Sequence, residues 1–87
     1  MHEFSLMKDL LEKIEKIAGD SGSSRVVAVK VKLGALSDIT PEHFGEHFEE
    51  AVLGTVAEGA RLDVEQMTDV SSPTAQDILL DSVEVAA

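Results

Sequence analysis

The stretch RVVAVKVKL at residues 25–33 constrains the fold more than any other part of the sequence. Apolar and polar side chains alternate along it, which is the pattern of a strand with one face in the core and one in water. The residues expected on the inner face are Val27, Val29, Val31 and Leu33, and those expected on the outer face are Lys30 and Lys32. The sequence therefore predicts a half-buried strand here.

Residues 5–18 have the periodicity of an amphipathic helix. Ser5 is placed to cap this helix and Gly19 to end it. The apolar stripe comprises Leu6, Met7, Leu10, Leu11, Ile14, Ile17 and Ala18. We expect this stripe to lie against the sheet.

A second helix is predicted to begin at Thr40-Pro41-Glu42. Thr40 is a suitable cap, and proline is favoured at the first helical position. Phe44, Phe48 and Val52 follow at intervals of four residues, so we expect them to be buried. The helix is expected to end near Gly54.

Two more strands are predicted, at residues 61–67 and 77–86. The second alternates imperfectly, which favours a bulge or a register shift. The polar stretch 68–76, TDVSSPTAQ, lies between them as a short loop. This order predicts one α+β domain over residues 1–87, with two helices packed on one face of a small mixed sheet of three to four strands.

The composition argues against several classes of function. Seven basic and 17 acidic residues give a net charge of −10, which disfavours nucleic acid, and the only aromatic residues are three Phe. The absence of cysteine excludes disulfides and thiolate-bound zinc. No apolar run has the length of a membrane span and no export leader is visible, so we expect a soluble, cytoplasmic protein. Convergent acid–base groups and a phosphate-binding loop are also lacking, so we expect no enzyme.

His43 and His47 form one candidate metal site. Their spacing puts both imidazoles on one face of the second helix, beside Glu46 and Glu50. This is a half-site for zinc or nickel. The alternative interpretation is a polar helix edge with two ordinary histidines.

The N-terminus, Met1-His2-Glu3, forms another candidate. The free amine, the amide nitrogen of His2 and its imidazole can close two fused chelate rings around one ion, and the amide of Glu3 supplies a fourth nitrogen. Ni(II) and Cu(II) favour such a square-planar, nitrogen-rich arrangement. A bulky residue such as His2 generally prevents removal of the initiator Met, which preserves the ligand set. The alternative interpretation is an ordinary frayed end.

Three segments carry a resemblance to a known family: MHEFSLMKDLLEKI at 1–14, VAVKVKLGALSDITPEHF at 27–44 and AEGARLDVE at 57–65. Together they resemble the HypA/HybF nickel metallochaperones, whose members begin Met-His-Glu-x-Ser. The closing LDSVEV is similar to the family's final strand. The resemblance implies that Met1, His2 and Glu3 bind Ni(II), with the Glu3 side chain in an orienting role. It also implies that some members add an acidic ligand at the position of Thr40, for which Asp38 is the nearest substitute.

The resemblance further implies delivery of nickel to the [NiFe]-hydrogenase large subunit or its maturation machinery, with the HypB GTPase as a further partner. One departure is large. Family members insert a zinc domain with paired Cys-x-x-Cys motifs where this chain has residues 68–76, so we expect nickel without zinc. The alternative function is a metal-independent HypA-like scaffold or adaptor in a hydrogenase-associated complex. Both hypotheses predict the same fold.

Overall fold

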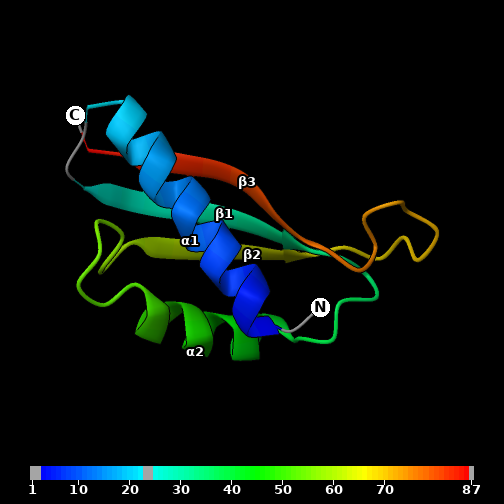
Figure 1. The fold of residues 1–87 in the computed structure, drawn as a ribbon. Coiled ribbons are helices and arrows are strands. Elements are labelled where there is room, and N and C mark those ends of the chain that lie inside the picture. Colours follow the sequence, from blue (N-terminus) through cyan, green and yellow to red (C-terminus); the bar gives the residue numbers. More distant parts are fainter. Residues whose placement is uncertain (1–2, 23–24, 87) are drawn as a thin grey trace.

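The structure, a computed structural model, describes residues 3–22 and 25–86 of the chain. Over these residues it contains the elements α1 (Glu3–Asp20), β1 (Val26–Leu33), α2 (Pro41–Ala51), β2 (Arg61–Gln66) and β3 (Ile78–Val85). The strands form one sheet in the order β2-β1-β3 (Figure 1). β1 pairs with β2 in parallel and with β3 in antiparallel orientation. The predicted α+β fold with a mixed sheet is confirmed.

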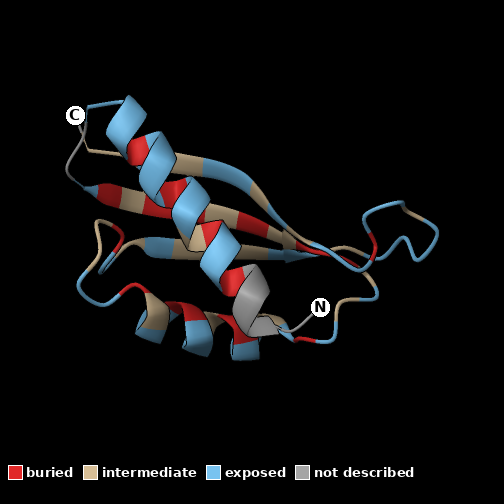
Figure 2. Cartoon of the chain, in the orientation of Figure 1, coloured by how far each residue is buried: buried red, intermediate tan, exposed pale blue. Residues whose placement is uncertain are grey.

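A hydrophobic cluster of described residues joins both helices to one face of the sheet, and Figure 2 marks buried residues on α1, α2 and β1. Phe44 and Phe48 are 0% and 1% exposed, as their spacing predicts. The Thr40 hydroxyl accepts a hydrogen bond from the His43 N–H at 3.1 Å, and Pro41 is the first helical residue. The predicted start of α2 is therefore confirmed, and Gly54 follows its end with a φ of 79°.

Two expectations for the first helix are wrong. α1 begins at Glu3, so Ser5 lies within the helix and does not cap it. Ile17 is 42% exposed, because the buried row runs through Leu10, Ile14 and Ala18 and leaves Ile17 at the margin of the stripe. The helix ends at Asp20, one residue beyond the predicted stop.

The expected alternation in β1 holds from Val29 to Leu33 and fails at its start. Val26 is fully buried and Val27 is only half-buried, the reverse of the prediction. The register with β3 shifts between Val26 and Ala28, so Val27 is an extra residue that has no pairing partner on β3. This bulge changes which side chains face the core.

A second register shift confirms the irregularity predicted for the third strand. Lys30 pairs with Ser82 and Val31 with Leu80, which leaves Asp81 as the extra residue. The Asp81 carboxylate lies 3.8 Å from the Lys30 ammonium and 3.7 Å from that of Lys32. The bulge therefore places a carboxylate between the two lysines on the outer face of the sheet.

Candidate functional site

The N-terminal candidate site lies at the start of α1. Met1 and His2 lie outside the described residues, and of Glu3 only the backbone is described, as the first residue of the helix. The first four backbone N–H groups of an α-helix have no acceptor within the helix. Coordination of a metal by the Glu3 amide nitrogen would therefore break no hydrogen bond of α1.

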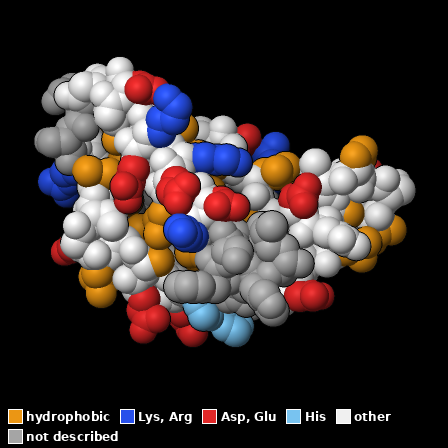
Figure 3. All heavy atoms as spheres, in the orientation of Figure 1, with side chains coloured by type: hydrophobic (Ala, Val, Ile, Leu, Met, Phe, Trp, Pro, Cys, Tyr) orange, Lys and Arg blue, Asp and Glu red, His pale blue; other side chains and the backbone are white. Residues whose placement is uncertain are grey.

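The second candidate pair lies on the exposed side of α2. The ring centroids of His43 and His47 are 4.6 Å apart and their planes differ by 29°, so the rings are stacked. In Figure 3 the histidine side chains lie at the lower edge of the molecule with acidic side chains beside them. The nitrogen lone pairs lie in the ring planes, so a shared ion would require one ring to rotate. Among the described side chains, those of residues 7–22 and 25–86, no three of His, Asp or Glu are grouped to hold a metal.

Asp38 and Thr40 lie in the segment between β1 and α2. Both line an open hollow of about 490 Å³. Met67 and Val70, from the segment that follows β2, also line it. The Thr40 hydroxyl is already engaged as the helix cap, whereas the Asp38 side chain is exposed. Of these two candidates, Asp38 has the donor group that is free to turn toward an ion.

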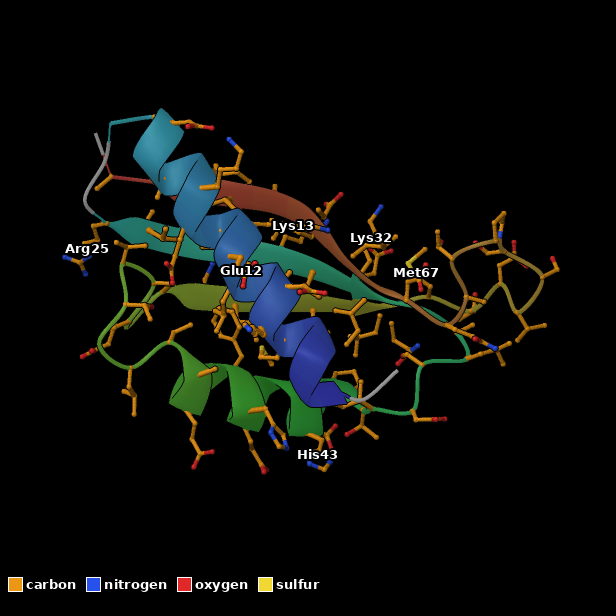
Figure 4. All side chains as sticks on the ribbon, in the orientation of Figure 1. Glu12, Lys13, Arg25, Lys32, His43 and Met67 are labelled. Atoms are coloured by element: carbon orange, nitrogen blue, oxygen red, sulfur yellow. The ribbon has the colours of Figure 1, made fainter. Side chains whose placement is uncertain are left out.

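The loop of residues 68–76 is held against the turn that follows β1. The Leu36 N–H donates to the Ala75 carbonyl at 2.7 Å, and the Gly34 N–H donates to the Asp77 carbonyl at 2.8 Å. Ala75 is buried at 5% exposure. Figure 4 shows Lys32 and Met67 at the same end of the sheet, where both line a smaller hollow beside this loop.

Position 34 has no room for a side chain at this contact, so it requires glycine. A Cβ there would lie 2.5 Å from the Ala75 carbonyl carbon and 2.7 Å from the Thr74 carbonyl oxygen. Atoms of the backbone cannot move aside as a flexible side chain can. The sequence patterns did not predict this contact, and the one signal for it is a glycine directly after a strand.

Local hydrogen bonds organise the tip of the same loop. The Asp69 carboxylate accepts from the Ser71 hydroxyl at 2.7 Å and from the Ser71 N–H at 3.0 Å. The Ser71 hydroxyl, followed by its backbone N–H, holds the pKa of Asp69 below its usual value of 3.8. The loop is therefore an ordered turn closed by its own polar groups.

None of the helices in the described part of the chain combines the length and the apolar character needed to cross a membrane.

Comparison with known proteins relates the chain to one family. The family model described as "HypA: Hydrogenase/urease nickel incorporation, metallochaperone, hypA" matches residues 1–72. A hydrogenase maturation factor HypA from Chlorobium limicola is 35% identical over 71 residues, which cover 82% of this chain and 61% of that protein. The corresponding factor from Roseiflexus sp. is 39% identical over 67 residues, which cover 77% of this chain and 54% of that protein. The chain thus spans about half to three-fifths of the length of these curated relatives.

The fold is also similar to that of a solved structure, titled "Solution structure of the Ni metallochaperone HypA from Helicobacter pylori". The two match with a TM-score of 0.81 at 21% identity, over 100% of this chain and 99% of that one. At this identity the likeness shows a shared fold and nothing finer.

Proposed function

Because the chain belongs to the HypA family of nickel-incorporation metallochaperones, we propose that it binds Ni(II) at its N-terminus and delivers it for [NiFe]-hydrogenase maturation. The observation that carries this proposal is the family match, which begins at Met1 and runs through residue 72. It includes the three residues whose nitrogens form the candidate site. The family is one of metallochaperones and not of enzymes, in agreement with the sequence-based expectation.

The proposed ligands are four nitrogens: the Met1 amine, the amide and imidazole of His2, and the amide of Glu3. Binding displaces a proton from each of the two amides. The two amidates offset the charge of Ni(II), and the amine and the imidazole are neutral, so these four ligands and the ion carry no net charge. A helix N-terminus disfavours a nearby cation, and a neutral complex at the start of α1 avoids that penalty.

An additional oxygen ligand is assigned to Asp38 in preference to Thr40. The Asp38 carboxylate is exposed, whereas the Thr40 hydroxyl accepts the His43 N–H at 3.1 Å. Recruiting the Thr40 oxygen to a metal would weaken the cap of α2, at a cost of about 1 kcal/mol. Recruiting Asp38 has no such cost.

The proposal extends to the cellular setting. Nickel would pass in the cytoplasm to the hydrogenase large subunit or its maturation machinery, with the HypB GTPase as a partner. We treat residues 1–87 as one nickel-binding domain, with residues 68–76 closing the position where the family carries its zinc domain. The anchoring of Ala75 and Asp77 to the turn after β1 supports a loop that closes without an inserted domain.

The test is a Ni(II) titration followed by calorimetry and by visible absorption of the planar complex. The expected result is stoichiometric binding that His2→Ala abolishes. The matched control is His43→Ala combined with His47→Ala, which removes the other histidines and should leave binding unchanged. Loss of binding only in the control would move the site to α2, and no binding by any variant would leave the metal-independent scaffold as the function.

A second readout connects binding with delivery. In cells that lack the gene, hydrogenase activity should return with the native protein and should not return with His2→Ala at limiting nickel. Excess nickel should bypass the defect if the protein supplies the metal. Rescue by His2→Ala at limiting nickel would favour a scaffold.

A further inference from the structure

The outer edge of β2 is unpaired in the sheet that the structure describes, because β2 has β1 on one side only. The Met67 N–H donates to the Leu33 carbonyl at 2.8 Å, which fixes the direction of the backbone groups at this end of the strand. The pairing of β1 with β2 is regular from Ala28 to Leu33. Alternate residues point their N–H and C=O groups to opposite sides, so those of Leu62 and Val64 face the open edge.

A groove lies beside this edge. Figure 1 shows α2 running along the outer side of β2. Side chains of the two elements enclose an open hollow of about 760 Å³, with Phe48 and Val52 from α2 and Leu62 and Val64 from β2 in its lining. Leu53 also lines the hollow and is 66% exposed. The groove therefore combines apolar side chains with backbone groups that are available for pairing.

The charges around the groove are mainly negative. Glu42 and Glu49 on α2 line it, and Glu58 joins them from the turn before β2. Among the described residues that line it, the basic side chain is that of Arg61, which lies 3.7 Å from the Asp63 carboxylate. Asp63 and Glu65 also project from the outer face of β2. A segment entering the groove would thus meet carboxylates on both sides of β2.

We propose that this edge and groove receive an extended segment of a partner protein with alternating apolar and basic side chains. The segment pairs with β2 as an added strand, a known mode of peptide recognition. Its apolar side chains enter the groove beneath α2, and its basic side chains lie beside Asp63 and Glu65. A second copy of this chain is a poor occupant, because each copy carries a net charge of −10 and would oppose like charges across the edge.

The test uses metal-free protein, so its outcome does not depend on nickel binding. The probe is an eight-residue peptide that alternates lysine and valine, and the control peptide has glutamate in place of lysine. Binding is followed by the shifts of backbone amide resonances. The lysine peptide should shift the amides of Leu62 and Val64 and those of α2, and the glutamate peptide should shift none.

Two pairs of variants separate the contribution of backbone pairing from that of charge. Val64→Pro removes an outward N–H, which a strand edge tolerates, and Val64→Ala keeps the N–H while shortening the side chain. The proline variant should bind the lysine peptide about tenfold more weakly than the alanine variant. Asp63→Lys, on the face where the peptide's lysines lie, should weaken binding about threefold, and Glu46→Lys, which changes the charge equally on α2 outside the groove, should not.

The proposal is overturned by any of three results. One is equal binding of the glutamate peptide. Another is an equal effect of the lysine substitutions at Glu46 and Asp63, a criterion that holds even if Val64→Pro fails to fold. The third is self-association in sedimentation that Val64→Pro removes, because it would make a second copy the occupant.

Discussion

Substitution of Gly34 by alanine should destabilise the protein strongly although it adds only one methyl group. The added Cβ would lie 2.5 Å from the Ala75 carbonyl carbon and 2.7 Å from the Thr74 carbonyl oxygen, so the loop backbone must move. That movement breaks the hydrogen bond from the Leu36 N–H to the Ala75 carbonyl, and it strains the one from the Gly34 N–H to Asp77.

The size of the effect follows from these contacts. A backbone hydrogen bond contributes about 1 kcal/mol net, and a buried group left without a partner costs about 1–3 kcal/mol more. Displacing Ala75, which is 5% exposed, lowers the free energy of unfolding further. We expect Gly34→Ala to lower the free energy of unfolding by about 3–5 kcal/mol. A domain of 87 residues has about 4–13 kcal/mol in total.

The matched control is Gly45→Ala on α2. A Cβ at Gly45 meets no atom within 4 Å beyond its chain neighbours and the backbone of its own helix, and alanine is the better helix former. This variant should therefore gain about 0.5–1 kcal/mol. Urea unfolding followed by far-UV circular dichroism measures both free energies. A Gly34→Ala protein within about 0.5 kcal/mol of the parent, the scatter expected of neutral substitutions, would refute the close approach of the loop.

Three further predictions concern the α2 cap, the loop and the metal. Thr40→Ala should lower the free energy of unfolding by about 1 kcal/mol in the same urea assay. Thr40→Ser keeps a hydroxyl that can cap the helix, so it should retain most of that free energy. An equal loss of stability in both variants would argue against the cap. Ser71→Ala should raise the pKa of Asp69 toward its usual value of 3.8, as measured by NMR titration of the carboxyl carbon, and an unchanged pKa would contradict the hydrogen-bond assignment. Because that pKa is depressed in the folded state, the associated stability is present above the unfolded pKa and is lost as the pH falls through the folded one. Nickel affinity should rise steeply with pH in calorimetric titrations, because the amides of His2 and Glu3 must release protons, and a flat profile would exclude amide ligands.

Local signals in the sequence predicted most of the elements correctly. Thr40 and Pro41 marked the start of α2, and the spacing of Phe44 and Phe48 predicted its buried face. These features depend on residues within one or two helical turns of each other. Contacts within so short a span can be inferred from the sequence.

The errors at Ser5 and Ile17 are local to α1, whereas the errors in the sheet arose where distant segments meet. The bulge that buries Val26 and exposes Val27 depends on the register between β1 and β3, which the sequence of β1 alone does not contain. The contact of Gly34 with Ala75 joins the turn after β1 to the loop before β3. Of the candidate sites, the sequence indicated the His43 and His47 pair but could not indicate that the rings stack.

The most direct test of the central claim is a Ni(II) titration of two forms of the protein, one with a free Met1 amine and one with that amine acetylated. Mass spectrometry should first verify the N-terminus of each. The account predicts stoichiometric binding by the protein with a free Met1 amine, and loss of tight binding in the acetylated protein with an unchanged circular dichroism spectrum. Acetylation removes the amine as a ligand while α1 remains in place. Equal affinity of the two proteins would contradict the N-terminal site.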